Sequence, residues 1–185
     1  MNNENHLPKI RSGFLEGALF LKSSHFNTRP KGEISLLVIH NISLPPKVFG
    51  GNFVEKFFLG EKLTGHPFFK EINGVEVSSH LYIKRTGKIV QFVSFLDRAW
   101  HAGKSSFKGR ENCNDFSIGI ELEGTDDLPF TKEQYDSLIR VTKSLMKTYP
   151  QITKERITGH SNIAPLRKTD PGECFDWAGF LSRLD

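Results

Sequence analysis

The chain has 185 residues, of which 37% are hydrophobic and 25% are charged, and this length and composition predict one packed domain and exclude disorder as its main state. Its formal charge of +4 at pH 7 favours anionic partners. The basic residues are scattered and interleaved with acidic ones, so we expect no nucleic-acid binding and favour a small, carboxylate-rich ligand instead.

Cysteine content and hydropathy bear on where the protein acts. Two cysteines, Cys113 and Cys174, are too few for the disulfide framework of a typical secreted domain, so both are expected to be reduced thiols. The apolar stretch at residues 13–21 is short, contains Glu16 and is followed by no small-residue cleavage site, unlike an export signal. No run approaches the about 20 apolar residues that cross a bilayer. We therefore expect a cytoplasmic protein that does not associate with membranes.

The first part of the chain divides into an arm and the start of a folded domain. Residues 1–33 are expected to form an N-terminal arm, extended or as a short helix, that ends in a turn at 29–32. The main domain is expected to cover residues 34–181. It begins with a continuous apolar run at 35–40, which predicts a central strand with His40 at its end. Phenylalanines at helical spacing within 52–60 predict a short helix with Asn52 at its N-terminus.

The middle of the chain predicts three strands. Two β-rich runs within residues 79–95 flank Thr86-Gly87, which is typical of a hairpin. In the run 118–123, apolar residues alternate with Glu121 and Glu123. This alternation predicts a strand with one core face and an opposite face that carries carboxylates.

A long helix is predicted after these strands. Residues 131–134 match a capping box, and Phe130 can pack on Tyr135 as a hydrophobic staple. An apolar stripe at spacings of three and four continues to Pro150, and the chain after Ile157 is rich in turns. The order of elements predicts a single α/β domain with a mixed central β-sheet flanked by helices.

Side chains able to bind a metal gather in the turn-rich segment near the C-terminus. His160, Lys168 and Asp170 lie within eleven positions, in a loop that two prolines would stiffen. If the sheet brings this loop beside His40, two imidazoles and a carboxylate form a zinc-binding set with a fourth position left for water. Other divalent metals remain possible. The plainer alternatives are a hydrogen-bonded core histidine and a solvated polar loop.

Hydrolysis at such an ion would also need groups that transfer protons and stabilise charge. Glu121 lies on the strand face opposite the core residues, where its carboxylate could accept and return a proton. Lys168 precedes Asp170 by two residues, which could bring its ammonium near a developing oxyanion. The alternatives are an exposed strand residue and a solvated or ion-paired lysine.

Four segments resemble the N-acetylmuramoyl-L-alanine amidase family, and most closely its cytoplasmic AmpD-type 1,6-anhydro-N-acetylmuramyl-L-alanine amidases: VIHNIS, RAWHAG, CNDFSIGIELEGTD and GHSNIAPLRKTDPG. The last is the most specific. The resemblance implies a fold similar to that of peptidoglycan recognition proteins. It also implies one zinc ion on His40, His160 and Asp170, with Glu121 as general base and acid and Lys168 as transition-state stabiliser.

The activity implied is zinc-dependent hydrolysis of the amide between the lactyl group of (1,6-anhydro-)N-acetylmuramic acid and the L-alanine of the stem peptide. The nucleophile would be a water molecule on the metal. The resemblance places this reaction in cytoplasmic peptidoglycan recycling, with an anhydromuropeptide as substrate. We further expect a monomer with its catalytic domain at 34–181.

By the same resemblance, Asn41, Trp100 and His101 are expected to line the substrate cleft, although Trp100 could equally be a core aromatic. The chain departs from the family pattern at Glu76 and Asn112, where basic contacts to the stem peptide are expected. Three basic side chains could compensate: Lys104, Lys108 and Arg110.

Two other functions are compatible with the same fold. One is a peptidoglycan-recognition module that binds fragments without cleaving them, which the complete set of metal ligands disfavours. The other is an exported autolysin acting on intact cell wall, which the lack of a recognisable signal disfavours.

Overall fold

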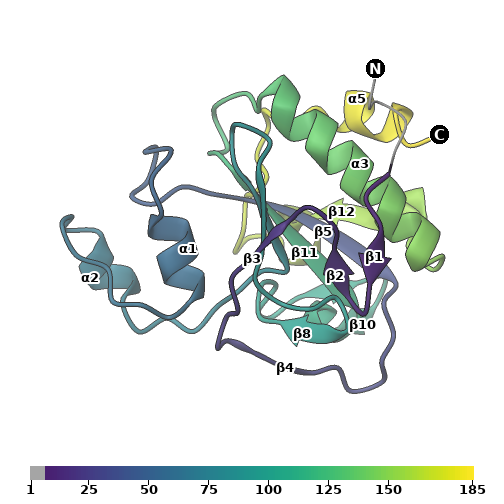
Figure 1. The fold of residues 1–185 in the computed structure, drawn as a ribbon, viewed down its shortest axis with the longest axis horizontal. Coiled ribbons are helices and arrows are strands. Elements are labelled where there is room, and N and C mark those ends of the chain that lie inside the picture. Colours follow the sequence, from purple (N-terminus) through teal and green to yellow (C-terminus); the bar gives the residue numbers. More distant parts are fainter. Residues whose placement is uncertain (1–6) are drawn as a thin grey trace.

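A six-stranded mixed sheet lies at the centre of the computed structural model, which describes residues 7–185 (Figure 1). The sheet confirms the predicted α/β class. Its strands, in spatial order, are β12 (Ile157–Gly159), β5 (Leu36–Ile42), β11 (Ser117–Glu123), β6 (Leu81–Ile83), β7 (Ile89–Gln91) and β3 (Leu19–Phe20).

The pairing of the strands determines which ends of them meet. The four strands β12, β5, β11 and β6 run parallel to one another, whereas β6 and β7 form the predicted antiparallel hairpin. Gly87 in the hairpin turn has φ +78°, a conformation that glycine adopts without strain. Because β5, β11 and β12 are parallel, their C-terminal ends lie at one edge of the sheet.

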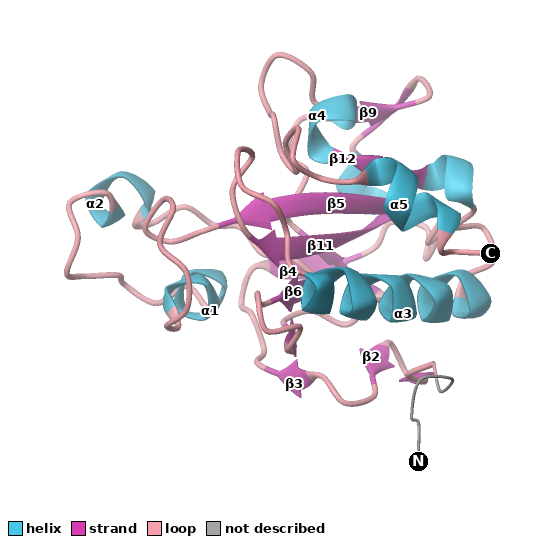
Figure 2. Ribbon diagram, turned by 90° about the horizontal axis from the view of Figure 1, so that it is seen from above, coloured by secondary structure: helices cyan, strands magenta, loops and turns pink. Residues whose placement is uncertain are grey.

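Helix α3 (Lys132–Thr148) covers one face of the sheet, with α5 (Trp177–Ser182) beside it, as both Figure 1 and Figure 2 show. The predicted capping box is present, since Thr131 and Gln134 exchange side-chain and backbone hydrogen bonds. Phe130 also contacts Tyr135 edge to face. The core between sheet and helices includes Leu37, Ile39, Ile118, Ile120, Leu122, Leu138, Val141, Leu145 and Phe180.

The opposite face of the sheet is covered by short elements and loops. Leu36 and Val38 of β5 pack there with Ala102, Phe116 and Ile163. All seven residues of β11 are therefore buried, so the strand face that carries Glu121 and Glu123 is enclosed within the protein. The covering elements are β8 (Asp97–Ala99), β9 (Ser106–Phe107), α4 (His160–Ile163) and a 3-10 turn at Cys113–Asp115. Strand β10 (Arg110–Glu111) pairs with β9, and a second 3-10 turn, Lys154–Arg156, precedes β12.

Helices α1 (Phe53–Phe58) and α2 (Phe69–Ile72) form a lobe that projects from one end of the sheet in both views (Figures 1 and 2). The predicted helix at 52–60 is confirmed, but the Asn52 side chain makes no capping hydrogen bond. An apolar cluster joins the lobe to the sheet, because Val54, Phe58 and Phe69 share it with Tyr82 of β6 and Val90 of β7.

The described part of the N-terminal arm consists of short strands rather than a helix; residues 1–6 of the predicted arm lie outside the described range. Its strands are β1 (Ile10–Arg11), β2 (Phe14–Leu15), β3 and β4 (Phe26–Thr28). Strand β3 extends the main sheet beside β7, and β4 pairs with β8. The arm is thus integrated into the fold. Both cysteines are free thiols, and no helix within residues 7–185 is long and apolar enough to cross a bilayer.

Candidate metal centre and active site

Strand register brings the candidate side chains together. On β5, His40 lies directly beside Glu121 of β11, and the preceding residue Ile39 lies beside Gly159 of β12. His160 follows Gly159 as the first residue of α4. Strand β5 therefore has Glu121, the candidate general base, on one side and His160 on the other.

Three donor atoms converge at this edge of the sheet. His40 Nδ1 lies 3.0 Å from His160 Nδ1 and 3.0 Å from Asp170 Oδ2, and the latter two atoms are 3.1 Å apart. Donors around one tetrahedral zinc ion at about 2.0–2.1 Å would be separated by roughly 3.3–3.4 Å. The predicted trio thus forms a group that could hold a metal ion.

The outer contacts of the two histidines leave their inward nitrogens free to act as ligands. His160 Nε2 is 3.1 Å from the carbonyl oxygen of Ala102, which can only accept, so Nε2 carries the proton and Nδ1 has a lone pair. His40 Nε2 is 2.9 Å from His101 Nδ1. Burial lowers the pKa of His40 to about 4, which keeps its imidazole neutral. Two neutral imidazoles and a carboxylate make a donor set suited to zinc.

His101 lies behind His40 and is buried, rather than forming an exposed wall of a cleft. Its Nε2 is 3.1 Å from Ser117 Oγ, so a hydrogen-bonded chain runs from His40 through His101 to Ser117. The ring packs directly on Gly119, where an added Cβ would come within 2.5 Å of His101 Cγ. Glycine at this position is what allows His101 to reach His40.

Glu121 is enclosed beside the candidate ligands. Its Oε1 is 4.0 Å from His40 Nδ1, while its Oε2 is buried and has no hydrogen-bond partner among the described residues. Burial, and secondarily the nearby Asp170 carboxylate, raise the pKa of Glu121 well above its ordinary value. A carboxyl group with a raised pKa can both take up and release a proton near neutral pH.

Lys168 is exposed and lies close enough for its charge to act on the site. Its ammonium opposes the raised pKa of Glu121 and contributes to the lowered pKa of His40. The loop before Asp170 therefore places a cation within electrostatic range of Glu121 and His40.

The other predicted cleft residues are held by neighbouring loops. The Asn41 side-chain amide donates to Asp126 Oδ1 at 2.7 Å and to the Pro171 carbonyl at 3.0 Å, which ties the loop that carries Asp170 to strand β5. Trp100 is partly exposed rather than a core residue. Its indole N–H donates to Asn27 Oδ1 at 2.7 Å.

The three cations proposed to compensate for Glu76 and Asn112 have different surroundings. Arg110 pairs with both carboxylate oxygens of Glu33 at 2.8 Å, and Lys108 lies over the Phe107 ring. Lys104 instead lines a cavity of about 300 Å³ next to α4. Its other lining residues include Asn112, Ile163, Ala164 and Arg167.

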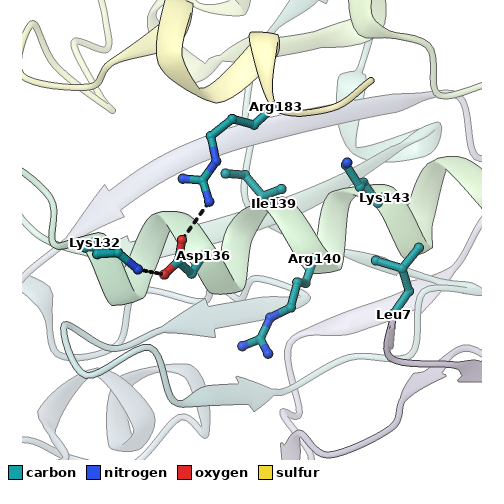
Figure 3. A pocket seen from close by; sticks show the side chains of 7 residues that line it. All are labelled: Leu7, Lys132, Asp136, Ile139, Arg140, Lys143 and Arg183. Carbon is teal, nitrogen blue, oxygen red and sulfur yellow. Dashed lines mark hydrogen bonds and ion pairs between the residues drawn. The ribbon is translucent and has the colours of Figure 1, made fainter. Parts of the chain in front are cut away.

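A larger cavity lies elsewhere and contains none of the candidate site residues. It has a volume of about 820 Å³ and lies along α3 and α5 (Figure 3). Among the described residues that line it, the single carboxylate, Asp136, is already paired with Lys132 and Arg183. Volume alone does not identify the site here, because the convergent ligand atoms lie at the sheet edge.

Comparison with known proteins is consistent with this geometry. Residues 27–173 match the N-acetylmuramoyl-L-alanine amidase family model, and the chain belongs to this family. It is 55% identical to the 1,6-anhydro-N-acetylmuramyl-L-alanine amidase AmpD of Haemophilus influenzae, covering 95% of this chain and 96% of that one. It is 54% identical to Escherichia coli AmpD, covering 92% and 94%. A crystal structure of a selenomethionine AmpD derivative superimposes with a TM-score of 0.92 at 52% identity, covering 95% and 99%.

The predicted family and fold class are confirmed by these matches.

The site contains two residues that the sequence did not single out. Arg167 and Ser117 both contact groups that hold candidate ligands. Arg167 could have been noticed in the sequence as a charged residue in the loop that carries the ligands. Ser117 is an isolated serine in a buried strand, and such a residue gives no sign of a role in the site.

Proposed function

We propose that this chain is a zinc-dependent 1,6-anhydro-N-acetylmuramyl-L-alanine amidase, which hydrolyses the amide between the lactyl group and L-alanine in anhydromuropeptides. The observation that carries the proposal is the convergence of His40, His160 and Asp170 with a buried carboxylate, Glu121, on the adjacent strand. Identity above 50% to AmpD enzymes over nearly the whole chain supports the substrate. A related amidase, E. coli AmiD, has been solved with anhydro-N-acetylmuramic acid-L-Ala-D-γ-Glu-L-Lys.

His40, His160 and Asp170 would hold the zinc ion, which when bound polarises a carbonyl and makes water more acidic. Glu121 would accept the proton of the attacking water and then deliver it to the departing amine of L-alanine. The burial of Glu121 beside His40, which raises the pKa of its carboxyl group, supports this role. Lys168 would stabilise the negative charge that develops on the lactyl oxygen.

For the substrate, we propose that the exposed part of Trp100 contacts the sugar ring and that Asn41 offers its remaining side-chain oxygen. We retain His101 as a candidate contact, although its burial favours an effect through His40. Lys104 is proposed to attract the carboxylates of the stem peptide, because it lines the cavity next to α4.

We also propose that the protein is a monomer and that residues 34–181 form its catalytic domain. Its reaction would belong to cytoplasmic peptidoglycan recycling. The free cysteines and the similarity to AmpD enzymes support this setting.

The direct test is to incubate the purified protein with anhydromuramyl tripeptide and zinc, and to identify products by mass spectrometry. We expect release of free tripeptide, and its loss when a chelator is added. Intact substrate under both conditions, with binding still measurable, would instead identify a recognition module. Efficient release of peptides from intact sacculi but not from soluble fragments would identify an autolysin.

A further inference from the structure

A backbone carbonyl controls how His160 is presented to the candidate metal site. Ala102 is fully buried, and its carbonyl oxygen accepts from His160 Nε2 at 3.1 Å. The N–H of the same residue donates to Asn114 Oδ1 at 2.8 Å. The hydrogen bond from His160 Nε2 to the Ala102 carbonyl selects the His160 tautomer whose Nδ1 lone pair points toward His40 and Asp170.

The same carbonyl accepts a second hydrogen bond, from Arg167. Its Nη2 is 2.7 Å from the Ala102 oxygen and 2.7 Å from the Lys104 oxygen. The guanidinium lies against Gly103, within 3.4 Å of the position of an added Cβ. Arg167 thus joins two segments that are distant in sequence, the stretch 102–104 and the loop that carries the third ligand, Asp170.

We infer that Arg167 is a positioning residue for the metal ligand His160. Its guanidinium fixes the Ala102 carbonyl, and the carbonyl in turn fixes the orientation and tautomer of the imidazole. Residues that hold metal ligands in this way contribute to metal affinity without touching the ion. The inference rests on the proposed metal site and adds a residue to which neither the family resemblance nor the ligand geometry assigns a role.

The charge of Arg167 allows another use, because the side chain also lines the cavity beside α4. In that case its effect would appear in substrate affinity and not in metal affinity. The two bonds to backbone carbonyls favour positioning, since they direct one end of the guanidinium toward the protein.

The test measures zinc affinity by competition with a chromophoric chelator, which requires no turnover. The variants are Arg167→Ala, Arg167→Lys and, as a matched control, Arg140→Ala, which removes an exposed arginine from the cavity along α3. We expect Arg167→Ala to weaken zinc binding about tenfold, and Arg140→Ala to leave it unchanged. Arg167→Lys should be intermediate, because one ammonium can still donate to both carbonyls.

Two further measurements separate positioning from a loss of folding. Methylguanidinium added at millimolar concentration should restore zinc affinity to Arg167→Ala, and the visible spectrum of the cobalt-substituted variant should return toward that of the unaltered protein. Unchanged zinc affinity in Arg167→Ala, with only KM for the muropeptide raised, would overturn the inference in favour of a substrate contact. Weakened affinity that methylguanidinium does not restore would also overturn it. His160→Ala serves as the reference: if that variant binds zinc normally, the proposed metal site itself is wrong.

Discussion

Glu121→Gln is expected to stabilise the metal-free protein while abolishing turnover. The Glu121 residue is 8% exposed and its Oε2 has no partner among the described residues, so its ionised form is an unfavourable buried charge. A buried acceptor without a partner costs about 1–3 kcal/mol, and more when it is charged. Because the glutamine amide keeps polar atoms in the same place, we expect a net gain of about 1–2 kcal/mol at pH 8. For a chain of this length that gain raises Tm by roughly 2–8 °C.

The dependence on pH follows from the raised pKa of Glu121. Between the unfolded and the folded pKa, the folded state binds more protons than the unfolded state, so the wild-type protein loses stability as pH rises through this window. The glutamine variant lacks this loss. The stability difference between the two proteins should therefore be smallest at pH 5, near the ordinary pKa of glutamate, and largest at pH 8.

Calorimetry with a chelator present, at both pH values, measures the effect directly. Glu61→Gln is the matched control, because Glu61 is exposed and should give no change. In zinc-loaded protein the gain should shrink, since a nearby cation stabilises the carboxylate. A metal-free Glu121→Gln protein that is no more stable than wild type at pH 8 would refute the reasoning.

Four other substitutions test residues of the site and of the structure that supports it. Lys168→Ala should reduce kcat by about 10²-fold or more and leave the zinc affinity unchanged. Lys104→Ala should instead raise KM for the muropeptide. Equal effects on kcat and KM in the two variants would argue against separate roles for these lysines. Gly119→Ala should destabilise the protein by about 1–3 kcal/mol through overpacking on His101, as measured by urea unfolding. Adding His101→Ala in the same chain should recover part of that loss, and no recovery would mean that the strain lies elsewhere. Arg29→Ala should lower the free energy of unfolding by about 3 kcal/mol, because buried Arg29 donates to the carbonyls of Phe95, Asn114 and Ser117. The control is Arg11→Ala, which removes an exposed arginine. Similar unfolding midpoints for the two variants would contradict this account.

Strands and helices with strong local patterns were predictable from the sequence. The apolar run before His40, the hairpin at Thr86-Gly87 and the capped helix from Lys132 each carry their own signal, and each is present. The strand pairing that puts His40 beside Glu121 depends on tertiary packing. No local pattern encodes it, so the family motifs had to supply the connection.

The features that the sequence did not predict depend on contacts between distant segments. Strand β3 has two residues and exists because β7 offers an unpaired edge. Helix α5 has only six residues, and its Phe180 is buried in the core beneath α3. The burial of His101 depends on the missing side chain at Gly119, a relation between two segments that neither reveals alone.

The in-register pairing of β5 with β11 has a consequence for how this chain can change. Successive side chains on a strand point to opposite faces, so a one-residue insertion or deletion within β11 before Glu121 would turn its carboxylate toward α3. An insertion would shift Ile120 to the position beside His40, and a deletion would shift Leu122 there. Loss of the proton carrier and damage to the core would then occur in one event. Length variation in this protein should therefore be confined to the connecting loops, and the spacing within the strand itself should tolerate none.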